Sequence, residues 1–205
     1  AKELVALNNE RKKLTEEGFD KCIEIIEEKN YCNDDIIVVY EPSINESICG
    51  IVAGRIKEKY YRPTIVLSNS STENIAKGSG RSIESFDIHE AVDQYKKNLE
   101  SFGGHKMACG LSIEISRIDD FRNFLNNKST MTENDKEKVI NIDTAISIDK
   151  LSLEFAESIN ELQPFGKDFE KPIFADKNVI IENISMIGKD KNTMKISLKK
   201  NNIII

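Results

Sequence analysis

The stretch IIVVYEPSINESICGIVAGRIKEKYYRPTIVL, residues 36–67, decides the fold class of this chain. Its two ends, 36–40 and 64–67, are apolar and rich in β-branched residues, which is typical of strands buried on both faces. Between them, residues 47–60 carry apolar side chains at helical spacing. Two buried strands joined by one helix predict a βαβ unit with a parallel strand pair and a right-handed crossover.

Further elements extend this α/β unit in both directions. Residues 1–30 have helical spacing and predict a connecting helix whose start lies outside the chain. The region 31–128 is predicted to be one domain with a mainly parallel or mixed sheet. Its later elements are a strand over 75–82 leading to a glycine-containing turn, a helix over 87–99, a strand over 111–115 and a helix over 119–125.

The last third of the chain has a different character. Residues 129–138 are polar and predict a linker. Within 139–205, short alternating segments predict antiparallel strands, plausible as a small β-barrel domain. We expect strands over 139–147, 179–184 and 194–198 and a helix over 151–162. The chain stops at Ile205 within a strand pattern, so we expect this domain to be truncated.

Composition excludes several classes of protein. The 205 residues are 39% hydrophobic and carry a formal net charge of −6, which fits a globular protein. The absence of a long apolar run and the charged start argue against membrane and secreted proteins, so we expect a cytoplasmic one. Net acidity argues against nucleic-acid binding, yet residues 162–205 hold eight lysines against five acidic residues. The net charge therefore hides a local excess of positive charge.

The cysteines and histidines point away from a metal site in this chain. The four cysteines are scattered without a CxxC pair, and only His89 and His105 are present. A disulfide framework or a structural zinc site needs closer spacing. We expect free thiols and no metal ligand set.

A glycine-rich segment, GGHKMACG at 103–110, is the strongest candidate for a ligand site. Paired glycines let a backbone pass close to a ligand and direct N–H groups at an anion, and a helix starting there would add its dipole. His105 offers a donor for a phosphate oxygen. A tight turn with a surface histidine is the simpler interpretation and stays open.

A second segment, KGSGRS at 77–82, has the composition of a phosphate clamp. Arg81 supplies a planar, bidentate guanidinium and Ser79 a short hydroxyl donor. Such a segment alone is more often a solvated loop. One predicted helix separates it from the first segment, so the fold can bring both to one rim, together with Lys77 and Lys106.

Several motifs occur in the order seen in the RecJ family. They are LNNER at 7–11, GIVAGR at 50–55, YRP at 61–63, GSGRS at 78–82, FGGHKMA at 102–108, QPFG at 163–166 and PIF at 172–174. Over nearly its whole length the chain resembles RecJ, a 5′-to-3′ single-strand-specific DNA exonuclease. The resemblance identifies 31–128 as a DHHA1 domain and 139–205 as OB-like, and it likens LNNER to the helix that joins the two catalytic halves.

The resemblance implies roles for particular residues. Ser79 and Arg81 would hold the 5′-terminal phosphate, and Arg11 would touch the strand from the connecting helix. The phosphodiester near the metals would be contacted by Gly103, Gly104 and His105, with His105 assisting catalysis.

The resemblance also implies what the chain lacks. The catalytic Mn²⁺ or Mg²⁺ would be held by an aspartate-rich half with an Asp-His-His triplet, which is not in this sequence. Two-metal phosphodiester hydrolysis needs such a cage, so we expect this chain to bind no cofactor and to cleave no DNA alone. The expected partner is single-stranded DNA, in repair and recombination. Single-stranded-DNA-binding protein and recombination helicases are further candidate partners, and we expect a monomer.

The chain departs from the family pattern at two positions, and two other functions stay open. Asn45 stands where many relatives have histidine, and Cys109 where alanine is usual. One alternative is a DHHA1 protein that acts on small phosphoesters or short oligonucleotides, for which an OB-like domain has little use. The other is the tRNA-binding DHHA1 domain of alanyl-tRNA synthetase, which GGHKMA and the following Pro-Phe-Gly disfavour.

Overall fold

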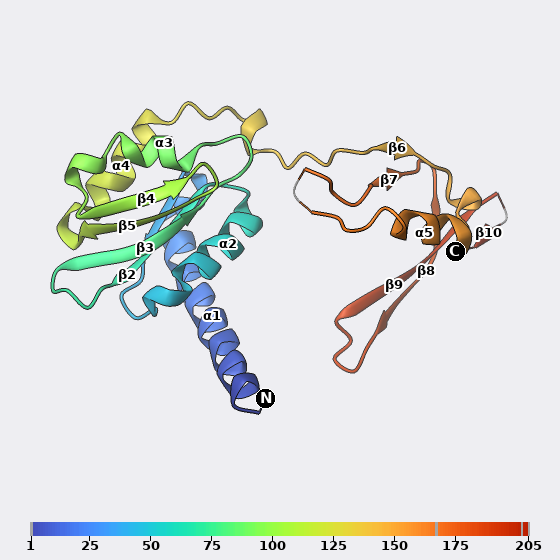
Figure 1. Cartoon of the computed structure of the whole chain (residues 1–205), viewed down its shortest axis with the longest axis horizontal. Helices are drawn as coiled ribbons and strands as arrows, with labels where there is room; N and C mark the ends of the chain where they lie inside the picture. The colour runs from blue at the N-terminus through green and yellow to red at the C-terminus, as the bar shows by residue number, and fades with distance from the viewer. Residues whose placement is uncertain (1, 167, 202, 205) are drawn as a thin grey trace. The chain divides into compact units, whose positions relative to one another are not determined.

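The chain divides into two compact units, one ending at Lys138 and the other beginning at Val139. The computed structural model describes residues 2–166, 168–201, 203 and 204, so the predicted strand end at Ile205 lies outside the described residues. Figure 1 draws the first unit from blue to yellow and the second from orange to red.

The first unit is built on a mixed five-stranded sheet with the strand order β1-β2-β3-β5-β4. β1 and β2 are parallel and joined through a helix, which confirms the predicted βαβ unit. The other neighbours pair antiparallel. The strands are β1 Ile37–Tyr40, β2 Thr64–Asn69, β3 Ile75–Arg81, β4 Ser101–His105 and β5 Ala108–Glu114.

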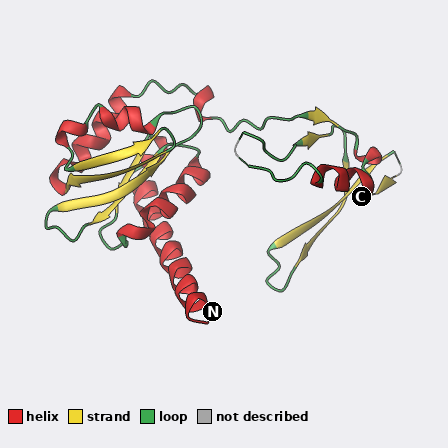
Figure 2. Ribbon diagram, in the orientation of Figure 1, coloured by secondary structure: helices red, strands yellow, loops and turns green. Residues whose placement is uncertain are grey.

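Helices lie on both sides of this sheet (Figure 2). α1 (Lys2–Glu28) and α2 (Cys49–Tyr60) pack on one face, and α3 (Ile88–Asp93) and α4 (Ile118–Lys128) pack on the other. This explains why residues 36–39 are all apolar, because Ile37 and Val39 face α1 and α2 while Ile36 and Val38 face the opposite helices. Short 3₁₀ helices lie at Tyr31–Asn33, Glu46–Ile48, Lys96–Asn98, Ile115–Arg117, Asn134–Lys136 and Ile148–Lys150.

The helices α1 and α2 cover only part of the sheet face on their side. The buried cluster beneath these two helices takes its strand residues from β1 and β2 only, namely Ile37, Val39 and Val66. One row of opposed residues continues across the sheet on this side, from Val66 to Ser79 of β3, Gly110 of β5 and Gly103 of β4. The apolar part of the row is buried, whereas Gly110 and Gly103 are exposed.

Two elements of this unit correct the sequence prediction, and one agrees with it. The helix expected over 87–99 ends at Asp93, and Tyr95 turns into the core, where its ring packs against Phe121 and Phe124. The strand predicted over 75–82 is confirmed as β3, which ends at Arg81 and is followed by a turn at 84–85. No helix begins at 103–110, where β4 and β5 instead form a hairpin.

The second unit contains few regular elements. β8 (Ile180–Ile187), β9 (Thr193–Lys200) and β10 (Ile203–Ile204) form an antiparallel sheet, as expected for the OB-like part. The unit also contains the helix α5 (Leu153–Asn160). The strand predicted over 139–147 shrinks to β6 (Thr144–Ala145), which pairs with β7 (Phe174–Ala175) in parallel rather than antiparallel. Residues 139–142 are exposed and unpaired in the structure, so nothing holds them extended.

Among the described residues, no helix has the length and apolarity to cross a membrane.

The side chain of Asn126 pairs with the backbone of Ile36, the residue just before β1. The Ile36 N–H donates to Asn126 Oδ1, and Asn126 Nδ2 donates back to the Ile36 carbonyl, each at 3.0 Å. Nδ2 also donates to the Arg122 carbonyl at 3.0 Å. The amide thus continues the strand ladder and fastens α4 to the sheet.

We expect Asn126→Ala to lower the free energy of unfolding by about 1–3 kcal/mol, because it leaves half-buried backbone groups unpaired. Urea unfolding followed by circular dichroism measures this. The neighbouring Asn127 is exposed, so Asn127→Ala is the matched control and should change stability by less than about 0.5 kcal/mol. Equal effects of the two substitutions would contradict the role of Asn126 in pairing the Ile36 backbone.

Candidate nucleic-acid interface

Strand register brings the two glycine-rich segments together on one face of the sheet. Alternate residues of a strand share a face, and directly opposed residues of neighbouring strands do too. Two adjacent rows therefore cross β3, β5 and β4 on the α1/α2 side: Arg81, Ala108 and His105 form one, and Ser79, Gly110 and Gly103 the other. A third row is formed by Lys77, Ser112 and Ser101. We call the nine residues of these three rows the open face.

Glycines in and behind the open face are of two kinds. A Cβ at Gly78 would lie 1.9 Å from the Val66 carbonyl oxygen, so this glycine is required by the neighbouring strand. A Cβ at Gly103 would meet nothing within 4 Å, and one at Gly110 would meet only the Gly78 oxygen at 3.9 Å. Packing within the chain therefore does not explain Gly103 and Gly110. Their effect is to leave the backbone bare, which is what close approach of a ligand requires.

Gly104 does not share this face, although the sequence grouped it with Gly103. It lies opposite Cys109, in the row that faces α3 and α4. A Cβ at Gly104 would lie 2.3 Å from the Ala108 carbonyl oxygen. The structure thus gives Gly104 a role in closing the hairpin.

Arg81 is held at the start of α2. A Cβ at Gly50 would lie 2.5 Å from Arg81 Nη2, so the glycine in the first turn of α2 makes room for the guanidinium. Arg81 Nη1 donates to the Gly80 carbonyl at 2.8 Å, and Arg81 forms no ion pair with any described carboxylate. The α2 N-terminus has no side-chain cap. A free cation beside the positive end of a helix dipole favours an anion.

His105 lies exposed at the far end of the Arg81 row. Its Nδ1 accepts a hydrogen bond from the Met107 N–H at 3.3 Å. In the neutral ring this leaves the proton on Nε2, which is then free to donate to a ligand oxygen.

The turn that carries His105 is anchored from behind. The Ser82 N–H donates to the Met107 carbonyl at 2.9 Å, and the Ile88 N–H donates to the Lys106 carbonyl at 3.2 Å. The Ser82 hydroxyl, which is buried, donates to the Phe86 carbonyl at 2.8 Å. Residues 82–88 therefore fix the position of the hairpin turn.

The two lysines predicted at the rim are not free partners of Arg81. Lys77 lies on the open face but pairs with Glu46 at 3.3 Å. An open depression of about 400 Å³ is lined by this ion pair together with Ser79, Ser101 and Ser112. Lys106 lines a different cavity, between α3 and α4.

Arg11 lies on α1, away from the strand rows. It borders a small depression with Ile51 and Arg55 of α2, and its Nη2 donates to Asn8 Oδ1 at 3.0 Å. Arg55 pairs with Glu16 at 3.3 Å. Arg11 is thus next to the helix whose start holds Arg81.

Sequence reasoning missed Gly50, for which no local signal exists, and gave Gly110 no role of its own. The available signal for Gly110 was the period of two in ACGLS, which places Ala108, Gly110 and Ser112 on one face of a strand. It was missed because 103–110 was interpreted as a tight turn or a helix start.

The described residues contain no cluster of three or more histidine, cysteine or acidic side chains that could hold a metal. The cysteines are free. Burial raises the pKa of the Cys109 thiol to about 11, so it stays protonated at neutral pH and is a packing residue rather than a nucleophile.

The two kinds of glycine predict opposite effects of adding one methyl group. Gly78→Ala should lower the free energy of unfolding by about 3 kcal/mol or more, because β2 must move away. Gly110→Ala should change it by less than about 1 kcal/mol, since the position is open. Thermal and urea unfolding measure both. A large loss of stability for Gly110→Ala would mean that packing does require this glycine.

Comparison with known proteins identifies the two units. A DHHA1 domain family model matches residues 33–130, and a RecJ OB domain model matches residues 142–205. The chain is 33% identical over 201 residues to the single-stranded-DNA-specific exonuclease RecJ of Bacillus subtilis (strain 168). This alignment covers 97% of this chain and 25% of that protein. It is 34% identical over 169 residues to RecJ of Haemophilus influenzae, covering 80% of this chain and 29% of the relative.

A solved structure agrees on the fold. The crystal structure of RecJ from Thermus thermophilus in complex with Mn²⁺ superimposes with a TM-score of 0.77 at 19% identity, over 98% of this chain and 29% of that one. The chain thus spans between a quarter and a third of the length of these relatives. By its DHHA1 domain followed by a RecJ OB domain, the chain belongs to the RecJ family.

Proposed function

We propose that this chain is the substrate-binding part of a 5′-to-3′ single-stranded-DNA exonuclease and that its open face grips the 5′-terminal phosphate and the following backbone. The observation that carries the proposal is the combination of bare glycines at 103 and 110 with the unpaired Arg81 cation in adjacent rows. A strand of nucleic acid is a ligand that needs both a cation and close access to the protein backbone.

The charge of the terminal phosphate explains its selection. A phosphomonoester carries a charge of about −1.5 to −2 at neutral pH, whereas each phosphodiester carries one negative charge. Arg81 offers two parallel donors, and the Ser79 hydroxyl lies two residues away on the same strand face. These two side chains therefore favour a 5′-phosphate over a 5′-hydroxyl end.

The remaining residues of the open face would serve the next phosphodiester. Gly103 and Gly110 let the sugar-phosphate backbone approach the strands, and His105 Nε2–H donates to a non-bridging oxygen. Such a donor stabilises negative charge that grows on the phosphorus oxygens during attack. Arg11 would contact the strand from α1.

The metal ions would come from outside this chain. The Thermus relative binds Mn²⁺, and a second structure of it contains Mg²⁺, but the described residues here offer no ligand cluster for either ion. We propose that divalent ions are held by another part of the enzyme and that the 205-residue chain alone binds DNA without cutting it.

The second unit would hold the strand further along. Residues 162–205 carry eight lysines against five acidic residues. Phe165 and Phe169 stack with their centroids 5.9 Å apart, and Phe169 is exposed. Basic and aromatic side chains together suit single-stranded nucleic acid. This unit favours a long DNA strand over the dinucleotide substrates of a DHHA1 phosphoesterase, and its match to a RecJ OB domain disfavours a tRNA-binding module. The setting we propose is DNA repair and recombination in the cytoplasm, as a monomer working beside single-stranded-DNA-binding protein and recombination helicases.

Arg81→Ala should selectively weaken binding of 5′-phosphorylated single strands. Loss of a charged hydrogen-bond pair is worth about 1.5–3 kcal/mol, which corresponds to an affinity loss of about tenfold or more. Fluorescence anisotropy with 3′-labelled oligothymidylates measures it, with a 5′-hydroxyl strand as the control that should be unaffected. Equal losses on both strands would show that Arg81 is not the terminal clamp.

Two glycines of α2 provide a matched pair for the same question. Gly50→Ala should push the Arg81 guanidinium aside and reduce the preference for a 5′-phosphate, because the new Cβ would lie 2.5 Å from Nη2. Gly54→Ala adds the same methyl group one turn later in open space. It should leave binding unchanged and stabilise the helix by about 0.5–1 kcal/mol. If both variants keep the full phosphate preference, the position of Arg81 is irrelevant to the clamp.

A further inference from the structure

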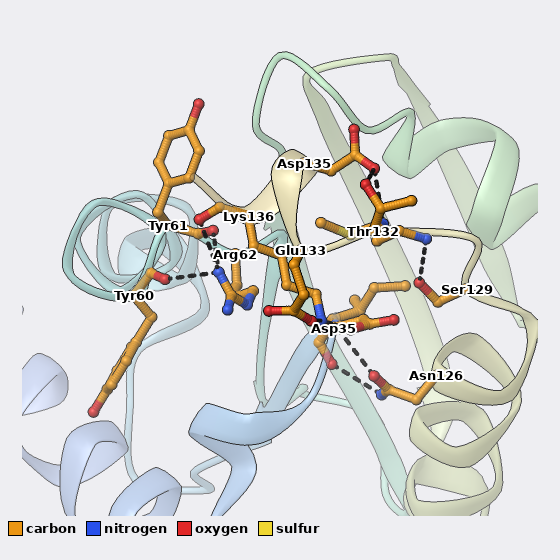
Figure 3. A network of polar contacts seen from close by, with 12 residues as sticks. Asp35, Tyr60, Tyr61, Arg62, Asn126, Ser129, Thr132, Glu133, Asp135 and Lys136 are labelled. Atoms are coloured by element: carbon orange, nitrogen blue, oxygen red, sulfur yellow. Dashed lines mark hydrogen bonds and ion pairs between the residues drawn. The ribbon is translucent and has the colours of Figure 1, made fainter. Parts of the chain in front are cut away.

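Residues 129–138 follow the DHHA1 unit, and their polar composition predicts a linker. In the structure they lie against the first unit, across the segments that lead into β1 and β2 (Figure 3). We call residues 129–138 the strap.

Asp35, just before β1, holds the strap through an ion pair. Its Oδ1 lies 2.7 Å from Lys136 Nζ, and the side chains of the two residues are only 23% and 13% exposed. Partial burial raises the pKa of Asp35, but the hydrogen bond from Lys136 and the positive charges of Lys136 and Arg62 outweigh it and hold the pKa below its ordinary value. The ion pair is therefore formed at neutral pH.

Backbone contacts fasten the same stretch. Arg62, just before β2, donates through Nη1 to the Lys136 carbonyl at 3.2 Å and to the Tyr61 carbonyl at 3.0 Å (Figure 3). The Ser85 hydroxyl donates to the Asp135 carbonyl at 2.9 Å. Within the strap, the Asp135 carboxylate accepts from the Thr132 N–H and hydroxyl. These contacts come from three separate segments of the first unit, so the strap has a defined path.

The firm attachment ends at Lys136. The next lysine, Lys138, lies 3.8 Å from Glu58, and both side chains are about 60% exposed. Such a surface pair contributes little. Asp143 is the first residue tied into the second unit, where its N–H donates to the Ile173 carbonyl at 2.9 Å. The free tether between the units is therefore residues 137–142.

We infer that Asp35 and Lys136 are positioning residues that shorten the tether between the two units, so that both engage one DNA strand with a higher effective concentration. The inference rests on the proposed function. With the strap attached, the six free residues have an end-to-end distance of about 13 Å; with it released, the fourteen residues 129–142 have about 21 Å. Effective concentration falls roughly as the −3/2 power of tether length, so release should lower it about three- to fourfold.

The test compares Asp35→Asn with Glu58→Gln in the 205-residue chain. Each removes one carboxylate charge and keeps the shape of the side chain, so nonspecific attraction to DNA changes equally. Binding is measured with 5′-phosphorylated oligothymidylates of about 5 nucleotides, which occupy one site, and about 30 nucleotides, which span both. Asp35→Asn should weaken the long strand by up to about three- to fourfold, the value for complete release of the strap, and leave the short strand unchanged. Glu58→Gln should change neither.

Release of the strap can also be measured without DNA, as the rate of trypsin cleavage. Trypsin should cut after Lys136 faster in Asp35→Asn than in wild type, and at the wild-type rate in Glu58→Gln, since both variants keep every lysine. Lys136→Met, with Lys138→Met as its control, repeats the binding comparison from the other side of the ion pair.

Three results would overturn the inference. They are equal affinity losses on short and long strands, unchanged long-strand affinity despite faster cleavage, or unchanged cleavage in Asp35→Asn. Failure of the proposed function gives a different result from these three, because the wild-type chain itself would then bind short and long strands equally. In that case the inference about the strap falls with the proposed function.

Discussion

The antiparallel register of β3, β5 and β4 is the constraint on which the rest of the site depends. It places Arg81 opposite Ala108 and His105, and Ser79 opposite Gly110 and Gly103, so segments far apart in the sequence form two adjacent rows. A slip by one residue would turn every side chain to the other face and bury the open-face residues in the core against α3 and α4. Gly78 fixes the place of β3 against β2, because only a glycine at this position lets β3 approach the Val66 carbonyl oxygen.

The same rows divide the sheet into a part that folds and a part that binds. At β1 and β2 the side chains on this face, such as Ile37, Val39 and Val66, are buried under α1 and α2. At β5 and β4 the rows consist of small residues and His105, without helical cover. Arg81 lies at the boundary, packed over Gly50 of α2 with one side of its guanidinium and otherwise unneutralised. This arrangement reconciles an acidic chain with a phosphate ligand, because a local cation in a fixed position matters more for binding than the net charge does.

Much of the scaffold could be predicted because its signals are local. Residues 36–40 are apolar on both faces, and the structure buries them between two helical layers. The strand over 75–82 could be predicted as well, and it forms β3. The hairpin at 103–110 could not, because its glycines favour a turn unless the partner strand is known to lie against them. The family resemblance supplied Ser79, Arg81 and His105, and the register explains their proximity, whereas Gly50 and the strap contacts of Asp35 arise from tertiary packing that no local pattern encodes.

The central claim is that the bare glycines of the open face receive the 5′ end of a DNA strand. Titration of the ¹⁵N-labelled chain with a 5′-phosphorylated oligothymidylate, followed by amide chemical shifts, tests it most directly. The account predicts that the largest shifts occur at Ser79, Arg81, Gly103 and Gly110, and that those at Ser79 and Arg81 shrink with a 5′-hydroxyl strand. Shifts confined to the second unit, or centred on the α3 and α4 side of the sheet, would contradict it.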